Sequence, residues 1–441
     1  MSHRYQKLID CPLTDRTMER RGLFEKGIKF DFRCSADSHS CEKVRKSFEK
    51  AGDILSSALH LKTPILVNAS FHSFCKDLGI SCKANEGLFI EASSIGLAQP
   101  VRLIPIKEHS DDAFPTLYPQ ALAKQLGMLP HPEYSDYDIE ANFNMDYPWY
   151  FEGEGPMRAD QADLTETALH ELVHGLGFIS SLYDFRASVD NFRESGKSSG
   201  LTPDWYYDAP ASDKSPFKFR GFLQYVFDRH IAVLPDLIPL DEYINRINRF
   251  RGVGMEFHST NDFARAFMQS SEYDVSQELL RIATTPRRLG FLPVGGKTAD
   301  DALILETSLK PFQGASSISH VDLATYRGTP ERLMTYLNEE NLPLTESVKH
   351  YGGPLGPKLL QSLHTLGYDL AKDHDELPKL HLRRNMQPTG VPGNDFSFQS
   401  PLPSNTSSTQ NSSISAGVTF LCFNLFYVSL IASLFSTLST L

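Results

Sequence analysis

The sequence predicts an α+β fold, and three patterns carry that prediction. Apolar and polar residues alternate near the N-terminus, around Ile28–Phe32, and again over 138–144, as they do in half-buried strands. Residues from about 163 to 175 instead repeat their apolar side chains with a helical period. A second helical pattern covers 356–368 and stops at a glycine. Strand and helix patterns in one chain therefore predict an α+β class.

Composition narrows the classes of function. The chain has 441 residues, of which 41% are hydrophobic and 22% charged, so it can bury the core of one large domain or two ordinary ones. Its formal net charge is −11, and it has no basic stripe and no glycine-rich phosphate loop. A nucleic-acid partner is therefore not expected.

The folded part is expected over residues 23–375, and its first elements follow in order. A helix is predicted around 43–59 after the first strand, and a second strand over 64–68. The apolar run at 101–106 is a strand or a sheet edge. The alternating segment 138–144 is expected at the edge of the sheet, where an extended substrate could pair with it.

The next helix carries the most informative motif of the chain, H-E-L-V-H at residues 170–174. His170 and His174 are four residues apart, so both imidazoles point to the same side of a helix and can bind one zinc ion. Glu171 can then take a proton from a water on that ion. Glycines at 175 and 177 predict the helix end. The alternative is an ordinary amphipathic helix with two surface histidines.

A large insertion or helical subdomain is predicted over about 181–302. Helices are expected near 222–232, 240–249 and 262–268, and a strand over 302–307. The amphipathic helix at 356–368 would then close the domain, with its stop at Gly367.

Both ends of the chain differ in composition from this middle part. Residues 1–22 are polar and lack the apolar core of a signal peptide, so we expect the natural start of the gene to lie upstream. Residues 376–417 are rich in Pro, Ser and Thr and are expected to form a disordered stalk. The uncharged tail 418–441 predicts a GPI-anchor signal or, alternatively, a membrane-spanning helix. Extracellular attachment to the cell surface is therefore expected, and sequons at Asn405 and Asn411 agree with it.

The cysteines favour the same oxidising compartment. Five of the six lie within the first 82 residues. The pairings Cys34–Cys41 with Cys75–Cys82, or Cys34–Cys75 with Cys41–Cys82, are equally allowed by the sequence, and reduced thiols are the alternative. Cys11 is left over, and as a thiolate it could serve as a latency switch on zinc.

A catalytic zinc needs a third protein ligand, because the pentapeptide supplies only two. The compact pattern H-E-x-x-H-x-x-G-x-x-H fits at Gly177, but its last position is Ser180. His320 is the best candidate for the third ligand, and Glu194 lies in a loop-like context. Three other histidines compete with it: His230, His258 and His350.

With His320 in place, the chain resembles the metzincin clan of zinc peptidases. The residues that carry the resemblance are H-E-L-V-H-G-L-G-F, a distant S-H, L-M-T around Met334 and a G-P-x-L-L-x-x-L-x-x-L-G-Y helix. The nearest likeness is to the leishmanolysin-like peptidases, in which an insertion separates the glycine from the third histidine. The resemblance implies a metzincin-like catalytic domain with a twisted mixed sheet, a zinc-site helix and a helical C-terminal part.

The resemblance also implies a role for each matching residue. His170, His174 and His320 would bind one catalytic Zn²⁺, and Glu171 would be the general base. Met334 would form the turn beneath the ligands, and Gly177 would let the chain turn away from the helix.

Two more residues near the third histidine have an open role. Tyr336, two residues after Met334, could stabilise an oxyanion or simply pack. Asp322 could orient the ring of His320, or it could be solvated.

The expected activity is hydrolysis of peptide bonds in a protein or peptide substrate, by water that Glu171 deprotonates. One rival is a zinc hydrolase acting on another amide or an ester, because the motif fixes the water and not the substrate. The other rival is a non-catalytic surface binding protein that keeps the fold. Nothing in the sequence indicates the oligomeric state.

Overall fold

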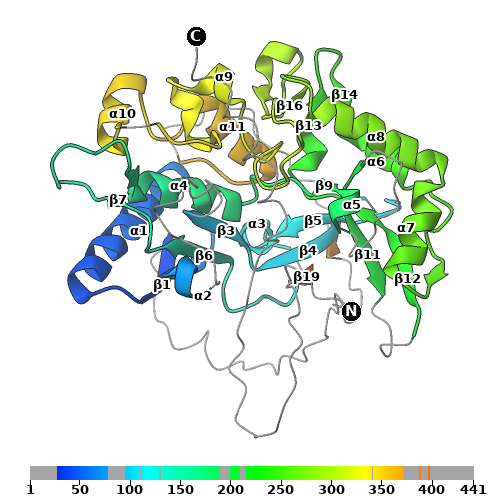
Figure 1. Cartoon of the computed structure of the whole chain (residues 1–441), viewed down its shortest axis with the longest axis horizontal. Helices are drawn as coiled ribbons and strands as arrows, with labels where there is room; N and C mark the ends of the chain where they lie inside the picture. The colour runs from blue at the N-terminus through cyan, green and yellow to red at the C-terminus, as the bar shows by residue number, and fades with distance from the viewer. Residues whose placement is uncertain are drawn as a thin grey trace, which may run out of the picture.

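The protein has a mixed α+β fold built from several small sheets and the helices around them (Figure 1), so the predicted class is confirmed. The computed structural model describes residues 27–77, 95–109, 112–128, 131–188, 199–208, 215–339, 341–371, 387–388 and 396–397.

A four-stranded mixed sheet carries the N-terminal half. Its strand order is β1-β2-β6-β3. Strands β1 (Ile28–Cys34), β2 (Ile65–His72) and β6 (Ile139–Asn144) run parallel, and β3 (Gly96–Pro100) runs antiparallel to β6. The expectation that 138–144 forms the sheet edge is wrong, because β6 pairs on both sides and β3 is the edge strand. Alternation in sequence shows that one face is buried and says nothing about pairing.

Two helices cover the apolar face of this sheet. Strand β2 alternates buried and half-buried side chains along its whole length, so Ile65, Val67, Ala69 and Phe71 all point to the buried side. The helices α1 (Ser38–Ala58) and α4 (Leu164–Gly175) pack against each other, α1 also on β1 and α4 also on β3 and β6. The sheet edge β3 therefore lies beside the helix that carries the H-E-L-V-H motif.

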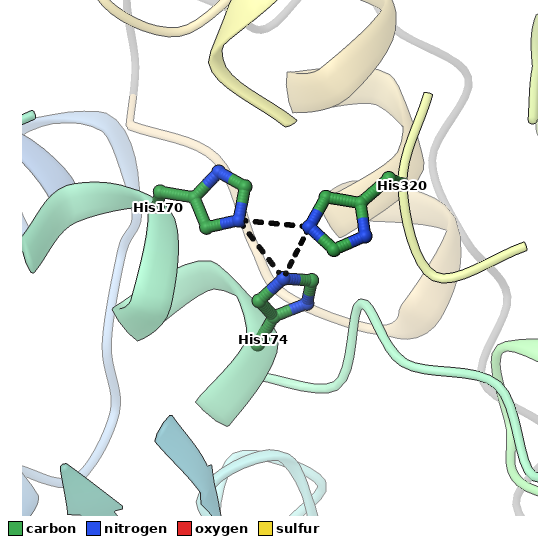
Figure 2. Close-up of side chains that lie close together, drawn as sticks. All are labelled: His170, His174 and His320. Carbon is green, nitrogen blue, oxygen red and sulfur yellow. Dashed lines mark hydrogen bonds between the residues drawn. The ribbon is translucent and has the colours of Figure 1, made fainter. Parts of the chain in front are cut away.

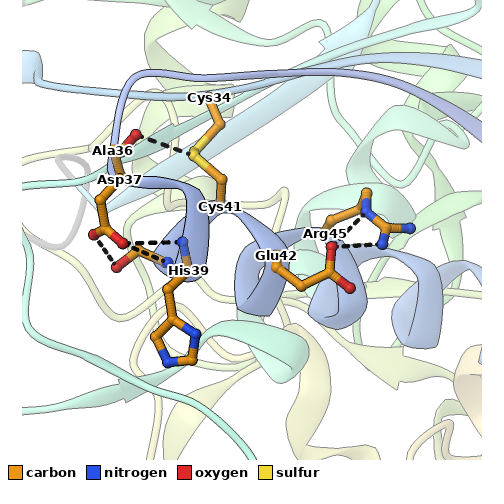
Figure 3. Close-up of a disulfide and its surroundings, with 8 residues drawn as sticks. Cys34, Ala36, Asp37, His39, Cys41, Glu42 and Arg45 are labelled. Atoms are coloured by element: carbon orange, nitrogen blue, oxygen red, sulfur yellow. Dashed lines mark hydrogen bonds and ion pairs between the residues drawn. A yellow bond between two sulfur atoms is a disulfide. The ribbon is translucent and has the colours of Figure 1, made fainter.

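A disulfide closes the loop between β1 and α1 (Figure 3). Cys34, at the end of β1, bonds to Cys41 in the first turn of α1. Asp37 lies inside this loop and caps the helix, because its side chain accepts hydrogen bonds from the backbone N–H groups of His39 and Ser40. The local pairing is thus the one formed, and the alternative of Cys34 with Cys75 is wrong. Cys11 and Cys82 lie outside the described residues.

A second small sheet stands next to the first. Strand β4 (Arg102–Lys107) pairs antiparallel with β5 (Thr116–Pro119). The short strands β18 (Gln387–Pro388) and β19 (Phe396–Ser397) also pair with β4, so these four residues of the predicted stalk run along the folded domain. The rest of 376–441 lies outside the described residues, and the stalk, tail and surface location stay predictions.

The segment predicted as an insertion contains sheets as well as helices. One sheet has the order β11-β12-β15 and another β14-β13-β16-β17. The helices at 240–249 and 262–268 are confirmed as α6 (Leu240–Ile247) and α7 (Thr260–Met268), and α8 (Ser271–Ala283) follows. The other elements are β9 (Tyr183–Asp184), α5 (Phe185–Ser188), β10 (Leu201–Thr202), β11 (Asp204–Asp208), β12 (Phe217–Leu223), η2 (Asp228–His230), β13 (Ile231–Val233), β14 (Ile238–Pro239), β15 (Glu256–Phe257), β16 (Leu289–Phe291), η3 (Ala299–Asp301) and β17 (Leu303–Ile304).

The helix predicted near 222–232 is wrong. These residues form the end of β12, a short 3₁₀ turn and β13. The buried carboxylate of Asp228 accepts the backbone N–H of Tyr225 and bonds Ser180 and Ser181. That tertiary anchor fixes a turn where local apolar content suggests a helix.

The C-terminal part is helical and shares the core of the sheets. It contains α9 (Leu323–Tyr326), η4 (Pro330–Met334), α10 (Leu344–Tyr351) and α11 (Pro357–Leu366), which lie together in Figure 1. The predicted closing helix is confirmed, and Gly367 ends it at φ +127°. The remaining short elements are α2 (Phe74–Asp77), α3 (Gln120–Ala123), β7 (Trp149–Tyr150) and β8 (Ala162–Asp163). Over the described residues, no helix combines the length and apolar character that crossing a bilayer requires.

Candidate metal centre

Helix α4 is buried along its whole length and has a defined start and end. Asp163 caps it by accepting the backbone N–H groups of Thr165 and Glu166. After the last turn, Gly177 adopts φ +115°, and a Cβ there would come within 2.8 Å of the Pro119 ring. A glycine is therefore needed where the chain turns away from the helix, as the sequence predicts.

Shortly after α4 the chain passes Ser180, and it returns to the same place 139 residues later, at Ser319. The backbone N–H of Ser180 donates to the Ser319 hydroxyl at 3.1 Å. Ser180 occupies the position where the compact motif would carry its third histidine, and Ser319 directly precedes His320. The intervening segment thus begins and ends at one point beside α4, and its return delivers a histidine there.

Three imidazole rings meet at this point (Figure 2). The Nε2 atoms of His170 and His174 are 3.0 Å apart, and His320 Nε2 lies 3.1 Å from the first and 3.3 Å from the second. His170, His174 and His320 are all buried. Within the described part of the chain, they form the one group of at least three His, Cys, Asp or Glu side chains spaced to hold a metal ion.

A backbone carbonyl fixes the other ring nitrogen of each histidine. The Nδ1 atoms of His170, His174 and His320 lie 2.6, 2.7 and 3.0 Å from the carbonyl oxygens of Leu333, Phe178 and Ser316. A carbonyl can only accept, so each Nδ1–H donates and each neutral ring carries its lone pair on Nε2. Three lone pairs then face one another, which is unfavourable unless a cation lies between them.

Burial keeps the three rings neutral. It lowers the pKa of His170 to about 4 and of His174 to about 3, the latter with help from His170 itself. The pKa of His320 is also held well below its usual value, first by burial and then by the two other rings. Neutral imidazole is the form that binds a metal.

The cluster fits a zinc ion. A tetrahedral ion with nitrogen ligands at roughly 2.0–2.1 Å holds those nitrogens about 3.3–3.4 Å apart. The observed separations of 3.0–3.3 Å are close to this spacing. Three protein ligands leave one position open, as in catalytic zinc sites rather than structural ones.

Glu171, which stands between the two histidines of the motif, is buried, and its carboxylate is anchored to the sheet edge. One of its oxygens accepts the backbone N–H of Ala98 in β3 at 2.7 Å. Burial raises the pKa of Glu171 to about 8, and the Ala98 hydrogen bond opposes that rise. A carboxylate with a raised pKa is suited to taking and returning a proton near neutral pH.

The segment around Met334 is tied to two of the histidines through its backbone. Met334 is fully buried at the end of η4, and its carbonyl accepts the N–H of Val321, the residue after the third histidine. The preceding residue, Leu333, supplies the carbonyl that holds His170. Tyr336 is half-buried, and burial raises its pKa. Among the described residues, its hydroxyl makes no hydrogen bond to the three histidines.

Several expectations about neighbouring residues are corrected. Asp322 does not orient His320; it caps α9 by accepting Thr325 N–H, and the Ser316 carbonyl holds the ring instead. His230 is not in the cluster, and its ring packs on Phe291. His258 and His350 are exposed away from the cluster, and Glu194 lies outside the described residues.

Sequence reasoning missed the groups that hold the site together, because most of them are backbone atoms. The carbonyls of Ser316, Phe178 and Leu333 and the N–H of Ala98 could be any residue's, so no motif marks them. The Ser180–Ser181 pair does carry a signal. Adjacent hydroxyls at the position of the missing ligand suggest a buried acceptor nearby, and Asp228 is that acceptor.

This chain belongs to the SPBPB7E8-like family, whose model matches residues 2–389. It is similar to a protein of Schizosaccharomyces pombe named "Uncharacterized protein PB7E8.01", with 28% identity over 363 residues. The matched region is 77% of this chain and 62% of that relative, so the chain spans less than two thirds of the length of its relative. No solved structure matches the chain.

Proposed function

We propose that this protein is a zinc-dependent endopeptidase of the metzincin type, in which His170, His174 and His320 bind the ion and Glu171 is the general base. One observation carries the proposal: three buried Nε2 lone pairs converge beside a buried carboxylate. Within the described residues, no other acid or base group has this combination of burial and ligand spacing.

The elements around the cluster support the metzincin assignment. An antiparallel edge strand, β3, lies beside the helix with the two histidines. A glycine with positive φ follows that helix, and the segment of the buried Met334 holds His170 through the Leu333 carbonyl. The third histidine arrives after a long insertion, which favours the leishmanolysin-like branch over the compact one.

The proposed chemistry divides between the ion and the protein. When bound, zinc supplies the acidity that makes a water molecule nucleophilic at neutral pH and polarises a scissile carbonyl. Glu171 accepts the proton of that water on its free carboxylate oxygen and passes it to the leaving amine. The Ala98 N–H holds the other oxygen, so the carboxylate stays aimed at the site. The three backbone carbonyls keep each ring in the tautomer that binds the ion.

The edge strand also favours an extended peptide as the substrate. Strand β3 pairs with β6 on one side, and among the described strands it has no partner along its other edge. A free edge offers backbone groups to an extended chain, which is how β-augmentation holds peptides. Esters and small amides would lack these contacts, so we propose a protein or peptide substrate.

The test is the zinc content and peptidase activity of the full chain, beside Glu171→Gln and His320→Ala. We expect one zinc per native chain, zinc retained without turnover in Glu171→Gln, and zinc lost or much weakened in His320→Ala. Loss of a general base lowers the rate by about 10²–10⁴-fold. Quenched peptides and small esters are assayed side by side.

Each contrary outcome has a clear reading. Turnover of esters alone would overturn the peptidase proposal while keeping the hydrolase. A folded native chain without zinc, or with zinc and no turnover of any substrate, would favour a non-catalytic binding protein.

A further inference from the structure

A buried arginine stands directly beside the residue whose carbonyl holds His170. The Arg332 side chain is only 2% exposed, and its Nη2 donates to Glu166 at 3.1 Å and to the Ser347 hydroxyl. Its guanidinium also lies 5.5 Å from the ring centre of Tyr351. Its Nε and Nη1 atoms are buried and have no hydrogen-bond partner among the described residues.

This arrangement is costly to stability. Removing two charges from water has a large free-energy cost, and the attraction between them offsets that cost only when the remaining donors are satisfied. Here two donors of Arg332 are not satisfied. Apolar side chains of similar volume would often be as stable or more so in such a position. Stability alone therefore gives no reason for an ion pair here.

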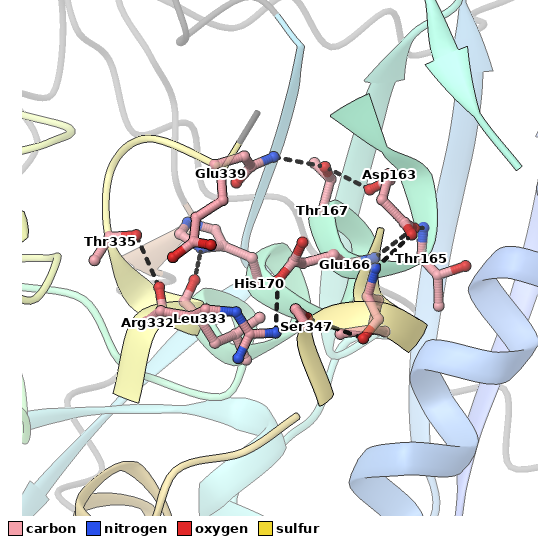
Figure 4. Close-up of polar contacts among 12 residues, drawn as sticks. Asp163, Thr165, Glu166, Thr167, His170, Arg332, Leu333, Thr335, Glu339 and Ser347 are labelled. Carbon is pink, nitrogen blue, oxygen red and sulfur yellow. Dashed lines mark hydrogen bonds and ion pairs between the residues drawn. The ribbon is translucent and has the colours of Figure 1, made fainter. Parts of the chain in front are cut away.

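The ion pair and the His170 hydrogen bond are parallel links between the same two elements (Figure 4). Glu166 and His170 lie one helical turn apart on α4, and Arg332 and Leu333 are neighbours in η4. Glu166 binds Arg332, and His170 Nδ1 donates to Leu333 O at 2.6 Å. The ion pair thus holds Arg332 against α4, and this fixes the position of the carbonyl of the next residue, Leu333, relative to that helix.

We propose that Glu166 and Arg332 are a positioning pair for the metal centre. By fixing η4 against α4, they place the Leu333 carbonyl so that His170 keeps its Nδ1 proton and aims its Nε2 lone pair at the ion. Neither side chain touches the ion or the substrate. The inference rests on the proposed metal site, and it adds two residues that no motif of the sequence marks.

The rival explanation is that the pair only stabilises the fold, and a double substitution separates the two. Glu166→Leu with Arg332→Met removes both charges together, so no lone charge stays buried. The single variants would leave one, and breaking one partner of a buried pair is strongly destabilising. The double variant should therefore fold without zinc about as stably as the native chain.

The experiment measures zinc affinity by competition with a chelator and the visible absorption spectrum of the Co²⁺-loaded protein. We expect the double variant to keep its metal-free melting temperature while its zinc affinity falls by about 10–100-fold, the usual effect of losing an outer partner of a ligand. The Co²⁺ bands should also shift, because the coordination geometry at His170 changes. Glu166→Asp keeps the charge but shortens the side chain, and it should weaken zinc binding in the same direction.

The control is the surface pair Asp208–Arg220, at 2.5 Å and more than a third exposed. Asp208→Leu with Arg220→Met should leave zinc affinity and the Co²⁺ spectrum unchanged. Native affinity and spectrum in the folded Glu166/Arg332 double variant would overturn the positioning proposal. If that variant fails to fold, Glu166→Asp decides: native affinity there overturns the proposal as well. A native chain that binds no zinc would instead overturn the metal site itself.

Discussion

The histidine rings are held by main-chain atoms. The three Nδ1–H groups donate to carbonyls in three different segments. These are Phe178 after α4, Ser316 before the third histidine and Leu333 in η4. The direction of each Nε2 lone pair is therefore decided by the path of the backbone. Side-chain substitutions near the site act on it by moving these carbonyls.

Asp228 is expected to matter for the metal centre although it lies in the insertion. It is fully buried and accepts hydrogen bonds from Ser180, Ser181 and the N–H of Tyr225. In Asp228→Asn, an NH₂ group replaces one of the carboxylate oxygens. This new donor would face the donors of Ser180, Ser181 or Tyr225. We expect a loss of about 1–3 kcal/mol in the free energy of unfolding. Zinc binding should also weaken, since Ser180 contacts the residue before His320.

Urea unfolding and chelator competition measure the two effects. Asp236→Asn is the control, because Asp236 is exposed and should tolerate the same change. Equal stability of the two variants would contradict the assigned role of Asp228.

His230 gives a pH dependence that is separate from the metal centre. Burial lowers its pKa to about 4 from the ordinary 6.5. The unfolded chain therefore binds a proton below pH 6.5 that the folded chain does not, and stability falls as pH drops from about 6.5 towards 4. His230→Gln should show a weaker loss over that window than the native chain.

The measurement is the urea midpoint from pH 7 to pH 4.5, with His258→Gln as the exposed control. The native chain and His258→Gln should keep parallel curves. A His230→Gln curve parallel to the native one would show that His230 does not carry the effect.

At this scale, the sequence predicts side chains well and main-chain partners poorly. His170, Glu171 and His174 stand in one motif, and the resemblance adds His320. The structure brings the three histidines together. The role expected for Asp322 is wrong because a carbonyl four residues before His320 takes its Nδ1–H instead. A backbone carbonyl acceptor is present at every residue and an N–H donor at every residue except proline, so their use depends on the fold alone.

Helix α4 depends on how it ends as much as on how it starts. Past its last turn, Gly177 combines a positive φ with close contact to Pro119, so two separate costs oppose any side chain there. The turn aims Phe178, whose carbonyl holds His174. The end of the element is therefore part of the metal centre.

Gly177→Ala is expected to destabilise the protein and weaken zinc binding. The φ of +115° alone costs on the order of 1–3 kcal/mol for a residue with a Cβ. The 2.8 Å approach to Pro119 adds to this. Gly153→Ala measures the cost of the positive φ alone, because Gly153 has φ +89° and no atom lies within 4 Å of an added Cβ.

Thermal unfolding of Gly177→Ala and Gly153→Ala compares the two positions, with zinc affinity as the second readout. The Gly177 variant should melt lower and bind zinc less tightly. Equal melting temperatures would mean that Pro119 moves aside without cost.

Element prediction succeeds where one period dominates and fails where tertiary contacts decide. The motif helix, α6, α7 and α11 all have a clear helical period and are found at the expected residues. Residues 222–232 do not form the expected helix, because Asp228 is held by a hydrogen bond from Ser180, which lies outside that segment. A local pattern also carries no information on strand pairing, so the sequence predicts the sheet edge at 138–144, whereas β3 is the edge strand.

Most of the buried apolar side chains in the described part of the chain belong to one large core, and the insertion contributes to it. Buried side chains of the first sheet, such as Val67, and of the insertion, such as Phe263 and Phe267, belong to a single cluster. Trp205 stacks on Phe263 at 4.8 Å, and Phe178 after the motif helix packs on Phe227 at 4.6 Å. The insertion is therefore not a separate domain with a core of its own.

Replacing residues 182–302 by a short flexible linker should destroy the metal centre. The cut would remove Phe227, on which Phe178 packs, and Asp228, which holds Ser180. We expect loss of soluble folded protein, measured by yield and near-ultraviolet circular dichroism. A folded, zinc-binding deletion variant would show that the insertion is dispensable.

The long return of the chain sets an order of events during synthesis. The second and third histidines are 146 residues apart, so ribosomes adding roughly 5–20 residues per second make His320 about 7–30 seconds after His174. Until then, the nascent chain offers a pair of imidazoles, which holds zinc far less tightly than three. Secure capture of the ion waits for the insertion to fold and bring Ser319 back to Ser180. In the proposed site, all three ligands would thus be together only in a chain that has finished folding.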